Sequence, residues 1–556
     1  VKNREKWVAA VAIVLAIIVF AVLCATQLSR WSVWFDESFT HYLIKFNFLD
    51  IAKWTASDVH PPLFYWSLKV WGIVFGTSAV ALRSMSVLFG AAVIVLAFIL
   101  TRKLFGKKAG YLALPLLVFS PILLRYSIEM RMYTMVAAII FAQILALLKA
   151  RETGLRLWWI IYGTLVAAGM WTQYFSCFVV LAEWIWLFAV SRQRGNRGKK
   201  MWRDVFGIRE KITYKNFCRQ IFTPGSAGFF WSIVTELILF SPWILTMFRQ
   251  MATVTATGFW VPPVSVSTIP DLISTTFFYQ LSDATTSWLF VLLLVILFLS
   301  AVLLVRIFCR KSLHDNRKFR ENFGLVLFAI IVPVVAMIVM SLPPLRSSFV
   351  DRYILASLIF VPILIAIVVG ENLDSAKSFR TKVWPMMLYL LSICAFVCGF
   401  ISLVYWGNCN KQSNTVSTVG GLMSQISAHS GTKTIPVIGD TAWSFYDADV
   451  YASAKNPVYF LDSQVDGYYF GSEKMLENSP DKITDLTGWV RENHAKKIWY
   501  ISSSNGAETP PAELGISAKW WINIRAIDET APNGWNMSLI HISEPMRLRR
   551  TLLAVF

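Results

Sequence analysis

Apolar segments of membrane-spanning length recur along the chain and constrain its fold more than any other feature. Of the 556 residues, 56% are hydrophobic and 15% are charged, whereas soluble domains carry about a quarter charged residues. A mostly apolar stretch of roughly 18 residues can cross a bilayer as a helix. We therefore predict a mainly α, polytopic membrane protein with about eleven transmembrane helices. The predicted spans are residues 7–28, 84–101, 109–124, 132–148, 157–174, 176–191, 228–247, 287–306, 323–342, 353–370 and 383–404.

The distribution of Lys and Arg predicts the orientation of these spans. With the N-terminus inside, the cytoplasmic segments contain about three times as many Lys and Arg as the outer segments up to residue 352. This bias explains the net charge of +19 without a nucleic-acid partner. We expect a multi-pass plasma-membrane protein with a cytoplasmic N-terminus and an extracytoplasmic C-terminal domain.

Changes in composition divide the chain into three parts. Residues 1–404 hold the predicted spans, and residues 29–83 form a long first outer loop. Residues 405–540 alternate short β-type runs with a helical stretch at 483–494, which predicts a small extracytoplasmic α/β domain. The tail 541–556 is basic and apolar and does not continue this domain. We interpret it as an atypical segment, and a sequence artefact is the alternative.

The second half of the first outer loop starts at His60 with the apolar segment HPPLFYWSLKVWGIVFG. Lys69 interrupts this segment, which is also short for a span. We predict a helix that lies in the membrane interface, with Trp66 and Trp71 at the depth of the lipid headgroups. His60 has two interpretations: it hydrogen-bonds a phosphate or transfers a proton, or it is an ordinary loop histidine before two prolines.

Two adjacent carboxylates, Asp36 and Glu37, follow the first predicted span. Neighbouring residues need not share a direction, so one carboxylate can face a site while the other pairs elsewhere. A carboxylate near its normal pKa can accept the proton of an attacking hydroxyl group. The surrounding aromatic side chains favour a shielded environment in which a sugar can stack, and the alternative is a solvated acidic pair at a helix end. These aromatic residues are Trp31, Trp34, Phe35, Phe39 and Tyr42.

Two further charged segments lie at the predicted outer ends of spans. In RYSIEMRMY, Arg125 and Glu129 are spaced i,i+4 and can pair on a helix, which leaves Arg131 available to bind an anion. The alternative is an interfacial ion pair that reaches the lipid headgroups. In SSFVDRY, Arg352 is a candidate to bind a phosphate, and an ordinary interfacial pair between Asp351 and Arg352 is the alternative. Charged groups at membrane depth are costly and usually face the interior of a helix bundle.

Four motifs in this order, FDESF, HPPLFYW, RYSIEMRMYTM and DRYILA, give the chain a resemblance to a known family. The set resembles bacterial members of the glycosyltransferase-C superfamily. Within that superfamily it is similar to family 39, which includes the protein O-mannosyltransferases and their aminoarabinose-transferring relatives. The resemblance covers about residues 1–370, and the ordered set is specific at superfamily level although each motif alone is weak.

The resemblance implies a fold of many transmembrane helices whose first outer loop carries the catalytic carboxylate and contains helices parallel to the membrane. It also implies a polyprenyl-phosphate sugar as donor, used on the outer face without a nucleotide. The residues it assigns to catalysis are Asp36 as the base and Glu37 as its neighbour. The residues it places near the donor are His60, Glu129, Arg131 and Tyr133, together with Arg352 and Tyr353 near the phosphate.

These observations predict an inverting glycosyltransferase in which Asp36 deprotonates an acceptor hydroxyl group and arginines, including Arg125, offset the charge of the departing phosphate. The acceptor is a protein, a lipid or a cell-wall polymer. No cofactor is expected, although a divalent metal held by Asp36, Glu37 and Glu129 is the alternative. Two rival functions are a lipid-linked sugar transporter that breaks no bond and a non-catalytic scaffold that binds cell-wall polymer.

Overall fold

The computed structural model describes residues 2–193, 228–257, 261–278, 286–310, 316–343, 345–406, 418–462, 474–495, 497–503, 520–522 and 535–541. The chain divides into two compact units. The helical unit comprises residues 1–28 and 47–406, and the α/β unit comprises residues 29–46 and 407–556. The boundary predicted after residue 404 is close to residue 406, where the helical unit ends. The structure also groups residues 29–46, the start of the predicted first outer loop, with the C-terminal residues.

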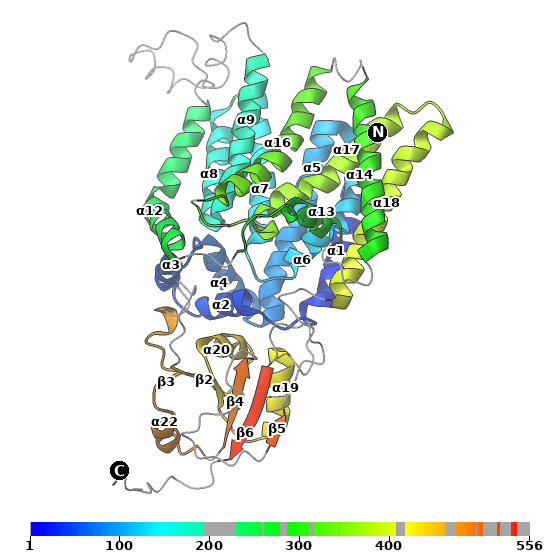
Figure 1. Ribbon diagram of the computed structural model, residues 1–556. Coiled ribbons are helices and arrows are strands. Elements are labelled where there is room, and N and C mark those ends of the chain that lie inside the picture. Colours follow the sequence, from blue (N-terminus) through cyan, green and yellow to red (C-terminus); the bar gives the residue numbers. More distant parts are fainter. Residues whose placement is uncertain are drawn as a thin grey trace, which may run out of the picture. The chain divides into compact units, whose positions relative to one another are not determined.

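Long helices make up most of the helical unit (Figure 1). Eight of the helices in the described ranges are long and apolar enough to cross a membrane. Every predicted span overlaps a long helix, but α5 covers most of two of them, so the count of eleven crossings stays a prediction. The long helices are α1 (Lys2–Leu28), α5 (Ala79–Val118), α7 (Tyr133–Thr153), α8 (Arg156–Thr172), α9 (Cys177–Gln193), α12 (Gly228–Thr257), α14 (Thr286–Phe308), α16 (Arg317–Met340), α17 (Leu355–Asp374) and α18 (Phe379–Trp406).

A break at Gly106 divides α5 where two predicted spans meet. The φ angle of Gly106 is 88°, a conformation that glycine adopts without the steric penalty of a side chain. The two lysines that follow are paired with carboxylates of other helices, Lys107 with Glu5 and Lys108 with Asp374. The predicted cytoplasmic turn is therefore a sharp local break rather than a loop of several residues.

The centre of the helical unit is formed by α5, α7 and α17. Helix α7 packs against α5 and α8, and α17 packs against α5 (Figure 1). The most apolar window of α17 is 89% buried, whereas that of α1 is 22% buried. Helices with outward apolar side chains are typical of a lipid-facing layer, because lipid tails are as apolar as the side chains themselves.

A close contact between α8 and α12 gives a test of this packing. A Cβ atom at Gly163 would lie 2.5 Å from the backbone oxygen of Ser232 and 3.0 Å from its Cα. Gly163→Ala is therefore expected to destabilise the protein by about 1–3 kcal/mol, the usual cost of overpacking. Thermal unfolding in detergent measures the loss. Gly324→Ala in α16 is the control, because its nearest neighbour, the Trp186 ring, is 3.9 Å away; an equal loss in both variants would contradict this prediction.

Short helices occupy the segments between the long ones. The predicted first outer loop contains three of them, α2, α3 and α4, as the resemblance implies, and their orientation relative to the membrane stays a prediction. The sequence predicts no helix between the spans at 228–247 and 287–306, but the structure extends α12 to Thr257 and places α13 after it. The short elements are α2 (Phe35–Leu43), α3 (Phe48–Ser57), α4 (Leu63–Phe75), α6 (Pro121–Ser127), η1 (Tyr174–Ser176), α13 (Thr268–Phe278) and η2 (Asp351–Ile354).

The α/β unit is built on a sheet with the strand order β3-β2-β1-β4-β6-β5. Strands β3, β2, β1 and β4 are parallel, whereas β6 and β5 run antiparallel to their neighbours. The predicted helix at 483–494 is shorter, because Ile483 belongs to β3. Residues 542–556 of the predicted tail lie outside the described residues. The elements are α19 (Val419–Ser430), β1 (Val437–Gly439), α20 (Ala442–Asp449), β2 (Val458–Leu461), β3 (Lys482–Ile483), α22 (Leu486–Glu492), β4 (Lys497–Ser503), β5 (Trp520–Ile522) and β6 (Trp535–His541).

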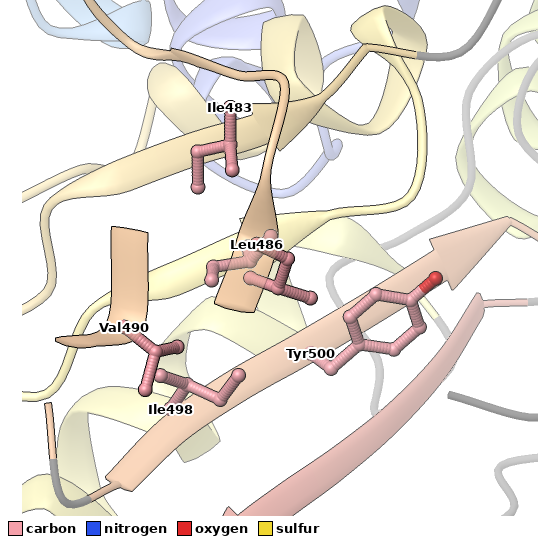
Figure 2. Close-up of a cluster of buried hydrophobic side chains, with 6 residues drawn as sticks. Ile483, Leu486, Val490, Ile498 and Tyr500 are labelled. Atoms are coloured by element: carbon pink, nitrogen blue, oxygen red, sulfur yellow. The ribbon is translucent and has the colours of Figure 1, made fainter. Parts of the chain in front are cut away.

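Helix α22 packs on part of one face of this sheet and forms a hydrophobic core with it. Leu486 and Val490 of the helix pack with Ile483 of β3 and with Ile498 and Tyr500 of β4 (Figure 2). Alternate residues of a strand point to the same face, so the spacing of Ile498 and Tyr500 places both side chains toward the helix. The predicted α/β character of the C-terminal region is confirmed.

Candidate active site

A buried cluster of charged and aromatic side chains lies in the helical unit between α6 and α7. Helix α6 ends at Ser127, and α7 begins at Tyr133. The connecting turn is closed by the backbone bond from the N–H of Arg131 to the carbonyl of Glu129, at 2.9 Å. Glu129 therefore lies beyond the helix that carries Arg125, and the predicted helical i,i+4 geometry for these two residues is wrong.

The guanidinium of Arg125 pairs with a residue far along the chain. Its Nη1 lies 3.3 Å from Oδ2 of Asp351, and the hydroxyl of Tyr126 donates to the same oxygen at 2.9 Å. The other oxygen of Asp351 accepts the backbone N–H of Arg352 at 2.9 Å. Asp351 thus fixes the segment before α17 to α6. The sequence offered a side-chain pair between the neighbours Asp351 and Arg352. In the structure the Asp351 carboxylate pairs instead with the guanidinium of Arg125.

Arg131 extends the cluster toward the first outer loop. Its side chain is 2% exposed, and its Nη1 donates to the hydroxyl of Tyr65 at 3.3 Å. Its Nη2 is 3.5 Å from Nε2 of His60, whose Nδ1 is 3.2 Å from Oδ2 of Asp58. Because the arginine can only donate, these contacts favour the tautomer in which Nε2 accepts and Nδ1–H faces Asp58.

Arg352 joins the cluster from η2, the short helix directly before α17. Its side chain is 5% exposed, and its Cζ lies 5.9 Å from the ring centre of Tyr133 and 5.7 Å from that of Tyr353. Tyr133 in turn packs edge-on against Tyr126, which interacts electrostatically with Arg125, Asp351, Glu129 and Arg352. The structure therefore brings together all the predicted donor-site residues. These are His60, Arg125, Glu129, Arg131, Tyr133, Arg352 and Tyr353.

A mostly apolar cavity of about 400 Å³ adjoins this cluster. His60 and Tyr353 belong to both, and the ring of Tyr353 stacks on Phe175 at 4.8 Å. The remaining wall comes largely from η1 and α12. Its apolar members include four methionines, whose flexible side chains suit an irregular ligand surface. These are Met170, Met247, Met251 and Met340.

Polar groups at one side of the cavity were not assigned to the site by sequence reasoning. The hydroxyl of Tyr174 accepts from Nε1 of Trp243 at 2.6 Å and hydrogen-bonds Oε1 of Gln250. Gln173 lines the cavity, is 2% exposed, and its Nε2 has no hydrogen-bond partner in the described part of the chain. A buried amide donor of this kind is available to an oxygen of a ligand. The only sequence signal for Gln173 and Tyr174 is their position in a short turn between two apolar helices.

The acid pair lies in the α/β unit, in the first turn of α2. Glu37 is fully buried, whereas Asp36 is partly exposed. The two carboxylates therefore have different surroundings, which is consistent with the expectation that neighbouring residues need not share a direction. The phenyl ring of Phe35 packs on Trp443 with ring centres 3.7 Å apart, which provides the aromatic environment expected around the pair. That Asp36 faces the arginine cluster stays a prediction.

No group of three or more His, Cys, Asp or Glu side chains that could hold a metal ion occurs among the residues that the structure describes. Of the candidate ligands, Asp36 and Glu37 belong to the α/β unit and Glu129 to the helical unit. Metal independence stays a prediction.

Comparisons with known proteins agree with the fold and the motifs. Residues 59–208 match the family described as dolichyl-phosphate-mannose-protein mannosyltransferase. The structure is similar to that of ArnT from Cupriavidus metallidurans in the apo state, with a TM-score of 0.57, 12% identity, and coverage of 97% of this chain and 98% of ArnT. It is also similar to the same protein bound to undecaprenyl phosphate, with a TM-score of 0.56, 11% identity, and coverage of 96% and 98%.

No curated protein sequence matches the chain. The predicted resemblance to family 39, which includes the protein O-mannosyltransferases, is confirmed over residues 59–208 by the family match. The similarity to the two ArnT structures shows a shared fold. The helical fold with a small C-terminal sheet is likewise confirmed.

Proposed function

We propose that the protein is a membrane glycosyltransferase that moves a sugar from a polyprenyl phosphate to an acceptor hydroxyl group at the outer face of the plasma membrane. The observation that carries the proposal is a set of buried arginines beside a mostly apolar cavity. Arginine binds phosphate through two directed hydrogen bonds, and an apolar cavity suits an isoprenoid chain. A relative with the same fold is known bound to undecaprenyl phosphate, a carrier of this chemical class.

The reaction follows as a single displacement with inversion. The acceptor oxygen forms a bond to the anomeric carbon while the bond from that carbon to the phosphate oxygen breaks. Asp36 accepts the proton of the acceptor hydroxyl, and the polyprenyl phosphate leaves with the bonding electrons. Arg131 and Arg352 stabilise the negative charge that grows on the phosphate, which is often the largest contribution to catalysis. His60, in contact with Arg131, helps to fix that guanidinium in place.

Purified full-length protein in lipid nanodiscs, supplied with a polyprenyl-phosphate sugar and candidate acceptors, tests this proposal. Release of free polyprenyl phosphate together with glycosylation of an acceptor is the expected result. Liposomes loaded with the same lipid test the rival transporter. Movement of the intact lipid-linked sugar across the bilayer without bond cleavage would establish the transporter and refute the transferase. Binding of a cell-wall polymer with neither activity would support the scaffold.

The cavity makes a prediction about donor binding. Met247→Trp adds a large ring to the cavity wall, so the lipid-linked donor is expected to lose apolar contact area there. Because this contact contributes mainly to ground-state binding, KM for the donor is expected to rise about tenfold with little change in kcat. Leu245→Trp on the same helix is the control, since Leu245 is 71% exposed and does not line the cavity. Equal KM values for the two variants would exclude this cavity as the lipid site.

A further inference from the structure

Helix α2, which carries Asp36 and Glu37, packs along helix α20 of the same unit. Tyr42 lies edge-on against Phe445 and Tyr446, with ring centres 5.5 Å and 5.3 Å apart. At the other end of α2, Phe35 packs on Trp443. Aromatic pairs contribute about 0.5–1.5 kcal/mol each beyond the area they bury. Contacts at both ends of a nine-residue helix resist its tilting against α20.

Polar contacts anchor the same helix and the residue that leads into it. The backbone N–H of Val33 donates to the hydroxyl of Tyr451 at 3.0 Å. Near the C-terminal end of α2, Nζ of Lys45 is 2.8 Å from Oδ1 of Asp449, and Nδ1 of His41 is 3.8 Å from the other carboxylate oxygen. These contacts fix the path of the backbone on both sides of the acid pair.

Between these anchors, the hydroxyl of Ser38 donates a hydrogen bond to Oδ1 of Asp447. Burial raises the pKa of Asp447 to about 7, with the Glu37 carboxylate acting in the same direction and the Ser38 hydrogen bond opposing both. Each residue of an α-helix turns the side-chain direction by about 100°. Fixing Ser38 on α20 therefore sets the rotation of α2 about its own axis, and with it the directions of Asp36 and Glu37.

We propose that Asp447 is a positioning residue, and that α20 of the C-terminal α/β unit holds the acid pair in its catalytic orientation through Ser38. The proposal rests on the proposed function, in which Asp36 is the base. A displacement of about 1 Å at a reacting group can lower a rate by about 100-fold. The role assigned to the C-terminal unit is thus to orient a catalytic group that lies in the first outer loop.

The test compares Asp447→Leu, which removes the acceptor, with Asp447→Asn, which keeps an acceptor oxygen. Asp447→Leu is expected to lower kcat about 10- to 100-fold with an unchanged KM for the lipid donor, and Asp447→Asn is expected to restore most of the rate. Ser38→Ala is expected to give a loss similar to Asp447→Leu. The double variant should lose no more than either single variant, because both remove the same hydrogen bond.

Hydrogen exchange of residues 35–43 in the full-length protein supplies a readout that needs no substrate. Asp447→Leu is expected to speed exchange in α2 several-fold, since a local opening there costs less free energy. Asn456→Leu is the control for general loss of stability, because Asn456 is buried and its Nδ2 hydrogen-bonds Oγ of Ser430 and the carbonyl of Ile435. This variant is expected to weaken the α/β unit without selectively exposing α2.

Unchanged exchange of α2 in Asp447→Leu would overturn the proposal, as would an Asn456→Leu variant that lowers kcat equally. Full transfer by Asp447→Leu despite faster exchange would also overturn it. Failure of the proposed function gives a different pattern, in which Asp36→Asn keeps its transfer rate while the exchange results still show that Asp447 anchors α2.

Discussion

Asp36→Asn is expected to reduce sugar transfer by about 10²–10⁴-fold, because it removes the proposed general base while keeping the size of the side chain. The amide cannot accept the proton of the acceptor hydroxyl at neutral pH. Binding of the lipid-linked donor should be nearly unchanged, since the proposed donor contacts come from residues of the helical unit. The measurement is single-turnover transfer in nanodiscs, together with the Kd for the donor lipid.

Asp50→Asn is the matched control for this substitution. Asp50 lies in the first turn of α3, in the same predicted outer loop, and accepts a hydrogen bond from Asn47 at 2.6 Å. It resembles Asp36 in residue type and helix position but has no proposed role in the reaction, so its variant should keep at least about half of the rate. Transfer by Asp36→Asn at the rate of the unmodified protein would falsify the assignment of the base.

Replacing Arg131 is expected to have the second large effect. Arg131→Met removes a guanidinium that is proposed to offset charge on the departing phosphate, and loss of one such donor costs about 10²–10³-fold in kcat. Arg131→Lys keeps the charge but loses the two-pronged geometry, so a smaller loss of about tenfold is expected. Steady-state kinetics with a polyprenyl-phosphate sugar measure both, and the loss should appear in kcat more than in KM.

Arg83→Lys separates this effect from the general cost of changing a buried arginine. Arg83 is 1% exposed, lies in the same unit, and donates from Nη1 to the carbonyl of Leu28 at 2.7 Å. Lysine can also donate to a carbonyl, so the variant should fold and keep its activity. If Arg83→Lys and Arg131→Lys lose activity to the same extent, the loss reflects folding and the phosphate role of Arg131 is wrong.

The helices and the buried cluster of charged and aromatic side chains were largely predictable from the sequence, because their signals are local. The lengths of the apolar segments predicted the long helices. The presence of charged residues at the ends of predicted spans indicated that Arg131 and Arg352 belong to a site. Helix α13 was not predicted, because its Thr-rich sequence hides the spacing of its buried apolar side chains, which are Leu272, Phe277 and Phe278.

Pairings between distant residues were not predictable in the same way. Nothing in the neighbourhood of Arg125 indicates that its partner is Asp351, which is 226 residues away. The placement of α2 with the C-terminal residues likewise depends on tertiary packing, in which Ser38 meets Asp447 across 409 residues of sequence. A single sequence carries local periodicity and charge, but it does not state which distant surfaces are complementary.

The grouping of residues 29–46 with the C-terminal part has a consequence for biogenesis. A ribosome adds about 5–20 residues per second, so roughly 20–80 s separate the synthesis of Ser38 from that of Asp447, its partner 409 residues later. During that interval the nascent chain already carries the helix with the acid pair, but not the surface on which that helix rests. The α/β unit is therefore completed only after the last long helix has been made, and activity should arise at the end of translation rather than by stages.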